Sequence, residues 1–567
     1  MLVAIAIKIE VVAVSRLNRR LLAAATIIMV AILSFAIAPG VARAADTGAI
    51  TVDGTVATRY DAYQLFSATV ADDDDADQKV ATDVTWANDA VRQAVLPVLH
   101  DAGLDSSAST AQSAAEWMNA DGHMTTALMA KLARSIVKAG AVSVALNAGA
   151  TAELPCGYWL VVADDDAIAQ GEAGTAPIMA LVGGAAVTVK PKAATPKVAK
   201  HVLEDGAAAW QKAADATVAD DLYWRLSATV PAGLTAYDTY TVRFVDTMSA
   251  GLDPSKVAAS MRVYVAAGAD GGFDAVSAGK DGRAGTEPAK GWTDITAQCA
   301  TKVAADGKAF TVRTGDLIAS LGGADAFTAG ARVVAVYNAP LNSACNHGIA
   351  KGNPNEVYLR YPRSPFADQS GDAGFTSTPS DDACAYTWDL ALTKRGSDGD
   401  KPLAGAVLSI ADDRGRTLAA DGTWDAEGKA TVTTGEDGRV TVSGMDSGKL
   451  EVRELKAPKG YAAFEGTRSV TVKAEGLDVD QVAAAKPKLT ITAESPLRAD
   501  SADGSTGSLE ASLINTPTGT PPSITTGGFM PSTGDMAMYA AAAAAVAGAA
   551  LIVVALLVKR GGGSHKE

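Results

Sequence analysis

Apolar and polar residues alternate with a period of two along much of the chain. Residues 60–70, 240–248 and 509–515 show this pattern, which is typical of strands that bury one face. Between residues 84 and 138 the period lengthens, and apolar residues recur at three- and four-residue steps, as in amphipathic helices. The pattern therefore predicts a mainly β chain whose first domain carries helical insertions.

Turn-rich stretches divide the alternating part of the chain. Residues 366–383 are rich in Ser, Asp, Gly and Pro, and residues 518–529 are rich in Pro, Thr and Gly. We expect an N-terminal domain at 45–190, a middle domain at 191–365, a linker at 366–383, a third domain at 384–517 and a spacer at 518–529.

The N-terminus has the pattern of an export signal. Three arginines within residues 16–20 precede the apolar run 21–38, and Ala42-Arg43-Ala44 fits a small-residue cleavage site. We therefore expect residues 1–44 to be a signal peptide that is removed before Ala45. A permanent N-terminal membrane helix is the alternative interpretation.

A second long apolar run lies near the C-terminus. Residues 536–558 carry no charge and are long enough to span a bilayer, and the basic pair Lys559-Arg560 follows them. The sequence predicts a transmembrane helix over 536–558 with its basic end in the cytoplasm. Together with export, this places residues 45–533 outside the cell.

Composition excludes several functions. The formal net charge of -15 disfavours a nucleic-acid partner, because phosphate binding needs clustered Lys and Arg. Scattered histidines and the consecutive aspartates at 72–75 lack the spacing of metal ligands, so we expect no metal and no other cofactor. The sequence does not predict an enzyme that acts on an external substrate.

Cysteine usage is sparse, with four residues and no CxxC pair. Cys299 and Cys345 lie in the same predicted domain and could form a disulfide outside the cell. Cys156 and Cys384 are either free or paired, and the sequence alone does not choose a connectivity.

The third domain carries a specific set of segments. Residues 450–461 read LEVRELKAPKGY and match the pattern YxLxExxAPxGY except at Leu450 and Val452. With an opening strand at 388–394 and a closing strand at 509–515, the region resembles a collagen-adhesin B-type (Cna-B) domain. The resemblance implies a small β-sandwich, and the expected fold class is tandem immunoglobulin-like (Cna-B-type) β-sandwich domains.

Strand parity brings three polar residues of this domain to core-facing positions. Lys394, Glu454 and Asn515 each continue the apolar face of a strand. Burial disfavours the charged forms of the amine and the carboxyl group. A neutral Lys394 can then attack the Asn515 amide while a protonated Glu454 polarises it and transfers protons as ammonia leaves. We predict a Lys394–Asn515 isopeptide bond, and a non-covalent Lys–Glu core pair is the alternative.

Other segments resemble SpaA-type backbone pilins of Gram-positive bacteria. Residues 154–161 (LPCGYWLV) and 175–178 (TAPI) match runs of the N-terminal domain of that family. In the middle domain, Lys200 and Asp246 each lie on the apolar face of a strand. Pilin middle domains join such a lysine to an asparagine beside the aspartate, so the resemblance implies a second isopeptide site. A buried salt bridge is the simpler alternative.

The asparagine of this second site is missing from its usual position. The closing segment at 359–365 reads LRYPRSP, and Arg363 stands where the family has asparagine. We expect either that the domain lacks the bond, with an Arg363–Asp246 ion pair as one substitute, or that Asn353 or Asn355 takes the asparagine's place.

The pentapeptide Met530-Pro531-Ser532-Thr533-Gly534 precedes the C-terminal apolar run. It resembles the LPxTG sorting signal of Gram-positive wall-anchored proteins, with Met530 in place of leucine. The resemblance implies that residues 530–567 are a sorting signal. A sortase would then cleave between Thr533 and Gly534 and transfer the Thr533 carboxyl to an amine.

A candidate for that amine ends the first domain. The run VTVKPK at 187–192 resembles the pilin motif WxxxVxVYPK, whose last lysine corresponds to Lys192. Gly183 and Lys190 stand where the motif has tryptophan and tyrosine. Lys190 is the alternative nucleophile, and a basic interdomain linker is the alternative interpretation of the run.

Together these resemblances imply a SpaA-type, sortase-polymerised major pilin, in which Thr533 of one subunit is joined to Lys192 of the next. The expected partners are pilin-specific and housekeeping sortases, identical subunits, peptidoglycan, and minor pilins or host ligands. The expected location is the cell surface, with attachment to the cell wall after a transient membrane stage. The alternative is a wall-anchored adhesin that never polymerises and binds host matrix.

Overall fold

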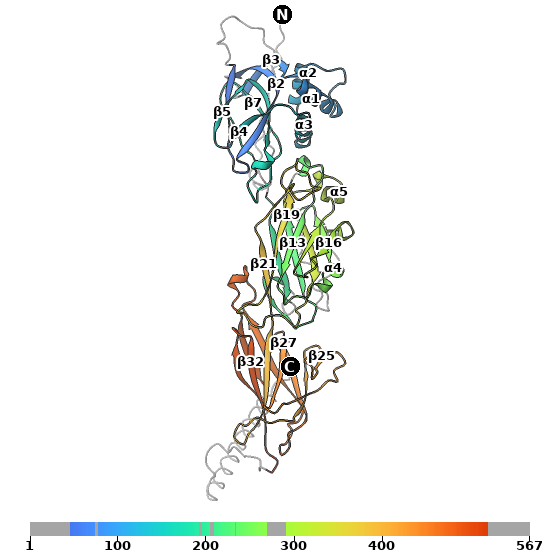
Figure 1. The fold of residues 1–567 in the computed structure, drawn as a ribbon, viewed down its shortest axis with the longest axis vertical. Helices are drawn as coiled ribbons and strands as arrows, with labels where there is room; N and C mark the ends of the chain where they lie inside the picture. Colours follow the sequence, from blue (N-terminus) through green and yellow to red (C-terminus); the bar gives the residue numbers. More distant parts are fainter. Residues whose placement is uncertain are drawn as a thin grey trace, which may run out of the picture.

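The computed structural model describes residues 46–73, 78–191, 195–204, 209–232, 234–268 and 291–519. Within them the chain forms three β-rich domains that follow one another along the longest axis of the molecule (Figure 1). The prediction of a mainly β chain with tandem β domains is confirmed. The expected signal peptide, sorting signal and transmembrane helix lie outside the described residues. Among the helices in the described ranges, none has the length and apolar character needed to cross a membrane.

The first domain combines two sheets with three helices, as the change of period predicted. One sheet has the order β5-β1-β8, and the other has the order β3-β2-β6-β7 with β4 paired to β2. Each helix begins at a capping residue (Asn88, Thr110 or Thr125) whose side chain accepts a hydrogen bond from the backbone N–H three residues on. The apolar helix faces join β2, β3 and β6 in one core. The elements are β1 (Thr47–Val52), β2 (Arg59–Asp73), β3 (Gln78–Trp86), α1 (Asp89–Asp101), α2 (Ala111–Asn119), α3 (Thr126–Lys138), β4 (Val144–Asn147), β5 (Thr151–Pro155), β6 (Gly157–Ala163), β7 (Ile178–Val182) and β8 (Val187–Val189).

The middle domain is a sandwich of two large sheets around one core. The sheets have the orders β10-β9-β12-β18-β14-β15 and β11-β21-β19-β13-β17-β16, with β20 paired to β19. The elements are β9 (Val198–Glu204), β10 (Ala209–Gln211), β11 (Ala213–Asp215), β12 (Tyr223–Thr229), β13 (Arg243–Met248), α4 (Val257–Ser260), β14 (Arg262–Ala266), β15 (Thr293–Asp294), β16 (Ala300–Val303), β17 (Ala309–Arg313), α5 (Leu317–Ser320), β18 (Arg332–Asn338), β19 (Asn353–Pro362), β20 (Phe375–Ser377) and β21 (Asp381–Tyr386).

The third domain is a smaller sandwich with a core of its own. Its sheets have the orders β27-β22-β32-β31 and β25-β24-β23-β28-β29-β30, with β26 paired to β23. The first and last strands, β22 and β32, are parallel neighbours. The elements are β22 (Trp388–Gly396), β23 (Val407–Ala411), β24 (Thr417–Leu418), β25 (Trp424–Asp425), β26 (Val432–Thr433), β27 (Arg439–Met445), β28 (Gly448–Lys456), β29 (Thr467–Glu475), β30 (Lys488–Ala493), β31 (Leu497–Asp503) and β32 (Ser508–Asn515).

The segment predicted to be a linker at 366–383 contains regular structure. Strands β20 and β21 both pair with β19, and Phe375 and Ala383 are buried. The Ser-, Asp- and Gly-rich composition of this segment reflects the turns before and between two short strands, of which β21 lies inside its sheet, between β11 and β19. Residues 384–386 consequently belong to the middle-domain sheet, and the first strand of the third domain begins at Trp388.

The middle and third domains are joined without a flexible connection. Only Thr387 separates β21 from β22, and its buried hydroxyl donates to Met445 O at 3.1 Å. Strand β11 runs parallel to β21, and Asp215 at its end accepts a hydrogen bond from Trp388 Nε1 at 2.6 Å. The backbone of one domain therefore continues directly into the core of the next.

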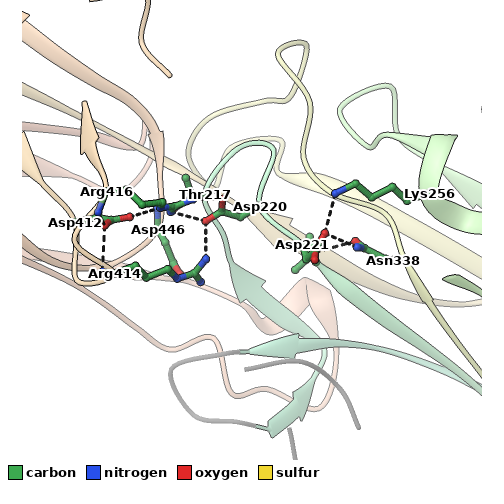
Figure 2. A network of polar contacts seen from close by, with 10 residues as sticks. Thr217, Asp220, Asp221, Lys256, Asn338, Asp412, Arg414, Arg416 and Asp446 are labelled. Atoms are coloured by element: carbon green, nitrogen blue, oxygen red, sulfur yellow. Dashed lines mark hydrogen bonds and ion pairs between the residues drawn. The ribbon is translucent and has the colours of Figure 1, made fainter. Parts of the chain in front are cut away.

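Charged side chains reinforce this junction (Figure 2). Asp220 of the middle domain accepts hydrogen bonds from Arg416 Nη1 at 2.6 Å and Nη2 at 2.7 Å. Asp412 holds the same guanidinium through Nε at 2.7 Å, and Arg414 adds a contact to Asp220 at 3.0 Å. This bidentate geometry fixes the orientation of the partners more firmly than a single contact between point charges.

Candidate functional site

Three buried polar side chains meet in the core of the third domain. Lys394 lies on β22 and Asn515 on β32, and in the parallel register Gly396 is level with Asn515. Asn515 is therefore two positions beyond Lys394 on the same face. Glu454 lies on β28 of the opposite sheet. The side chains of Lys394 and Glu454 are both 0% exposed, so the sandwich core encloses the cluster.

The three side chains already lie in contact. Asn515 Nδ2 donates to both carboxylate oxygens of Glu454 at 2.9 Å. Lys394 Nζ is 3.8 Å from Glu454 Oε1 and donates to Leu513 O at 3.0 Å. Asn515 Oδ1 has no hydrogen-bond partner among the described residues. Its carbonyl is therefore free to take a proton donor when the amide reacts.

Burial changes the protonation of this lysine. The loss of hydration lowers the pKa of Lys394 from 10.5 to about 8, and the charge of Glu454 only partly opposes the shift. At neutral pH roughly a tenth of such an amine is uncharged and nucleophilic. An uncharged amine beside an amide and a carboxyl group is the set that acyl transfer to lysine requires.

A second buried cluster lies in the middle domain, between its two sheets. Lys200 of β9 forms an ion pair with Asp246 of β13, and both side chains are 0% exposed. The Tyr337 hydroxyl of β18 accepts from Lys200 Nζ at 2.9 Å and donates to Asp246 at 3.0 Å. Asn355 of β19 donates through Nδ2 to the same hydroxyl at 2.8 Å. A lysine, a carboxylate and an asparagine thus converge here as well.

The structure separates the two asparagines that the sequence left as alternatives. Asn353 Nδ2 is bonded to Asn346 O at 2.9 Å and Ala385 O at 3.2 Å, and its Oδ1 accepts from Asn346 N at 2.8 Å. Asn355 is level with Met248 on the neighbouring strand, and Met248 is two residues from Asp246. Asn355 and Asp246 are therefore diagonal neighbours on the same face of the sheet. Asn355 Oδ1 has no partner among the described residues. Of the two, Asn355 is the amide that belongs to the cluster.

The suggested Arg363–Asp246 ion pair is wrong. Arg363 Nη1 instead donates to Asp165 O of the first domain at 3.3 Å. Asp246 is paired with Lys200 in the core. Arg363 follows the end of β19 and points to the domain boundary, so the expected closing segment is displaced relative to the lysine.

Burial acts on both ionisable groups of the middle cluster. It lowers the pKa of Lys200 to about 8, against the opposing attraction of Asp246. It raises the pKa of Asp246, against the opposing charge of Lys200. Both shifts favour the neutral amine and the protonated carboxyl group over the ion pair.

The predicted polymerisation lysine, Lys192, lies outside the described residues, as do Met530, Pro531, Ser532, Thr533 and Gly534. Lys190, the alternative, is described at the end of β8. Its side chain is 71% exposed, and its Nζ is 3.8 Å from Asp53 Oδ2. An accessible amine is therefore present at this end of the first domain.

The possible Cys299–Cys345 disulfide is wrong, because both of these cysteines are free thiols. Cys299 Sγ donates to Ile295 O at 3.3 Å, whereas Cys345 Sγ is 3.6 Å from His347 Nε2. His347 Nδ1 is 2.8 Å from Asp389 Oδ2, which completes a Cys–His–Asp chain that the sequence analysis missed. Burial raises the pKa of the Cys345 thiol, and the charge of Asp389 adds to the effect, so both favour the protonated thiol over the thiolate.

The sequence pattern does not single out Tyr337, because a tyrosine in the apolar strand RVVAVYN looks like an ordinary core residue. A signal for Asn355 was present. It shares strand parity with Val357, Leu359 and Tyr361, and the burial pattern of β19 shows all four on the inner face.

Comparison with known proteins finds a family model that matches part of the third domain. Residues 389–486 match the family model described as SpaA, prealbumin-like fold domain. The matched region begins within β22 and ends before β30, so it includes Lys394 and Glu454. Asn515 lies beyond it.

A curated relative is the trypsin-resistant surface T6 protein of Streptococcus pyogenes serotype M6. It is 29% identical over 143 residues, which cover 24% of this chain and 24% of the relative. The matched part thus spans about a quarter of the length of that relative.

Solved structures of backbone pilins resemble the chain at low identity. The T6 backbone pilin of Streptococcus pyogenes gives a TM-score of 0.46 at 17% identity, over 84% of this chain and 99% of that one. The major pilin SpaD of Corynebacterium diphtheriae gives 0.40 at 15% identity, over 83% and 97%. At these scores the likeness does not by itself argue for a shared function.

Proposed function

We propose that the chain is a structural shaft subunit of a covalently polymerised pilus on a Gram-positive cell surface. The observation that carries the proposal is the buried Lys394–Glu454–Asn515 cluster inside a domain whose residues 389–486 match the SpaA family model. The partial match to a streptococcal surface protein supports a location outside the cell.

In the third domain the cluster would form an isopeptide bond. The neutral Lys394 nitrogen attacks Cγ of Asn515, and a C–N bond forms. Glu454 takes a proton from Nζ and returns one to Nδ2, which it already contacts at 2.9 Å. The bond from Cγ to Nδ2 breaks, and ammonia leaves. The reaction is intramolecular and occurs once in each chain, so the protein would not be an enzyme with turnover.

The middle domain would form a second bond of the same type, between Lys200 and Asn355. The pairing of Lys200 with Asp246 supports it, since the carboxylate can take a proton from the amine within the buried ion pair. The pairing of Lys200 with Asn355 is further supported by their shared partner, because both side chains donate to the Tyr337 hydroxyl.

Polymerisation would use the two ends of the exported chain. A pilin-specific sortase would cleave between Thr533 and Gly534 and join the Thr533 carboxyl to Lys192 of the next subunit. A housekeeping sortase would transfer the last subunit to peptidoglycan. The exposure of Lys190 at the end of β8 supports an accessible amine in this region and keeps Lys190 as the alternative acceptor.

An immunoblot of cell-wall extracts tests the proposal. The wild-type protein is expected to give a ladder of high-mass species, and Lys192→Ala is expected to reduce it to a single wall-linked band. Lys190→Ala is the matched control, because it removes a neighbouring lysine of the same run. A single band in the wild type would instead favour the non-polymerised adhesin.

A further inference from the structure

The middle-domain cluster contains a group that the third-domain cluster lacks. The Tyr337 hydroxyl accepts hydrogen bonds from Lys200 Nζ at 2.9 Å and Asn355 Nδ2 at 2.8 Å, and it donates to Asp246 Oδ2 at 3.0 Å. All four side chains belong to residues that are 0% exposed. One hydroxyl therefore contacts the attacking nitrogen, the leaving nitrogen and the carboxylate, with no bulk water between them.

The need for this hydroxyl follows from the length of the acidic side chain. In the third domain, Glu454 reaches the leaving nitrogen of Asn515 with both oxygens. Aspartate is one methylene shorter than glutamate. Among the hydrogen bonds of the described residues, Asp246 bonds to Lys200 and Tyr337, and Asn355 Nδ2 bonds to Tyr337. The carboxylate thus reaches the leaving nitrogen only through the tyrosine.

We propose that Tyr337 is a catalytic residue that carries a proton from Asp246 to the leaving nitrogen of Asn355 during formation of the Lys200–Asn355 bond. This inference rests on the proposed middle-domain bond. The neutral Nζ of Lys200 attacks Cγ of Asn355, a C–N bond forms, and the Asp246 carboxylate accepts a proton from Nζ. The hydroxyl gives its proton to Nδ2 and regains one from Asp246. The bond from Cγ to Nδ2 breaks and ammonia leaves, so Tyr337 and Asp246 end in their starting protonation states.

The surroundings of Tyr337 suit this role. Burial raises the pKa of its hydroxyl well above the ordinary value, and the charge of Asp246 adds to the effect. The hydroxyl therefore stays protonated until it donates its proton to the amide nitrogen of Asn355. The ring packs edge-on against Phe310, with centroids 4.8 Å apart. This packing does not involve the hydroxyl, and Tyr337→Phe should keep it.

A refolding experiment tests the role. The mature chain is purified unfolded, refolded and sampled over time, with intact mass to count ammonia losses and peptide mapping to assign each cross-link. Tyr337→Phe is expected to slow the Lys200–Asn355 bond by about a hundredfold or more, as for loss of a general acid–base group. The Lys394–Asn515 bond in the same molecule should form at its normal rate. The matched control is Tyr361→Phe, which removes a hydroxyl of the same domain that donates to Gly171 O at 2.7 Å.

The outcomes distinguish this role from the bond itself. A Tyr337→Phe chain that forms the Lys200–Asn355 link at the wild-type rate overturns the role and leaves the bond in place. A wild-type chain without that link overturns both. If Tyr337→Phe fails to fold, site-specific difluorotyrosine keeps the ring shape and the hydroxyl but makes it more acidic. A several-fold change in the rate of the middle-domain bond alone then supports the role, and an unchanged rate overturns it.

Discussion

Asn515 and Glu454 lie in a two-point contact, with the amide nitrogen of Asn515 2.9 Å from each carboxylate oxygen of Glu454. The contact joins β32, the last strand in the sequence of the domain, to β28 of the facing sheet. Lys394 approaches the same carboxylate from the strand beside Asn515, at 3.8 Å. The nitrogen that would leave is therefore paired with its proton carrier before the lysine attacks.

Removal of this carboxylate should leave the third domain folded but not cross-linked. We expect the intact mass of Glu454→Ala to be one ammonia higher than the mass calculated for the same variant with the Lys394–Asn515 bond formed. By analogy with a disulfide that closes a loop of over a hundred residues, the free energy of unfolding should fall by about 4–5 kcal/mol. Mass spectrometry and thermal unfolding measure the two effects. Glu451→Ala, on an exposed position of the same strand, is the control and should change neither. A Glu454→Ala chain that has lost the same ammonia as the wild type would contradict the assignment.

The two asparagines of β19 should behave differently when each is replaced by alanine. Asn355→Ala removes the proposed acceptor, so the middle-domain ammonia loss should disappear. Asn353→Ala leaves backbone groups of Asn346 and Ala385 without their partner, which we expect to cost about 1–3 kcal/mol of stability while the cross-link still forms. Peptide mapping of both variants checks this, and a Lys200–Asn353 link would reverse the assignment.

Stability should depend on alkaline pH when the third-domain bond is absent. In Asn515→Ala, Lys394 remains buried as a free amine, with a pKa lowered to about 8 from 10.5 in the unfolded chain. Between these values the unfolded chain binds more protons than the folded chain, so the free energy of unfolding rises as the pH rises.

Urea unfolding at several pH values between 8 and 10.5 measures this dependence. Allowing for partial screening, we expect a gain on the order of 2 kcal/mol across the window. The double variant Asn515→Ala, Lys394→Met lacks the titrating amine and serves as the baseline. A gain of the same size in the double variant would show that other groups are responsible.

The junction between the middle and third domains should depend on Arg416 more than on Arg414. The Arg416 side chain is 20% exposed and holds Asp220 through two nitrogens, whereas Arg414 is 53% exposed and donates to Asp220 through Nη1. We expect Arg416→Ala to weaken the coupling of the two domains by about 1–3 kcal/mol and to widen the range of interdomain angles. Small-angle scattering and thermal unfolding check this, with Arg414→Ala as the matched control. Equal behaviour of the two variants would contradict the assignment.

Strand parity predicted the inner-face positions of Lys394, Glu454 and Asn515, because side chains alternate strictly along a strand. The helices between residues 84 and 138 were predictable from their longer period. Strand parity also predicts an inner-face position for Asn355. The family pattern instead aligns Arg363 with the reactive asparagine, and Arg363 lies after the end of β19.

Other parts could not be predicted from local sequence. The segment at 366–383 has the composition of a linker because much of it forms turns, and the strands β20 and β21 that arise in it are short. Tyr337 becomes distinguishable from a core tyrosine only when β9, β13 and β19 bring three polar groups to its hydroxyl. Such contacts join residues far apart in the sequence, and no local pattern encodes them.

The connection between β21 and β22 consists of Thr387 alone, and this affects how the chain would carry tension. With both proposed bonds in place, tension on the chain would pass from Lys200 to Asn355 and from Lys394 to Asn515, so the loops between the members of each pair carry none of it. Residues 356–393 are then the only backbone between the two bonds that remains under load. Half of them lie in β19, β21 and β22, whose ladder hydrogen bonds would be sheared together rather than opened one by one. The extensibility of a fibre made of such subunits would reside in that short segment and in the connections between subunits.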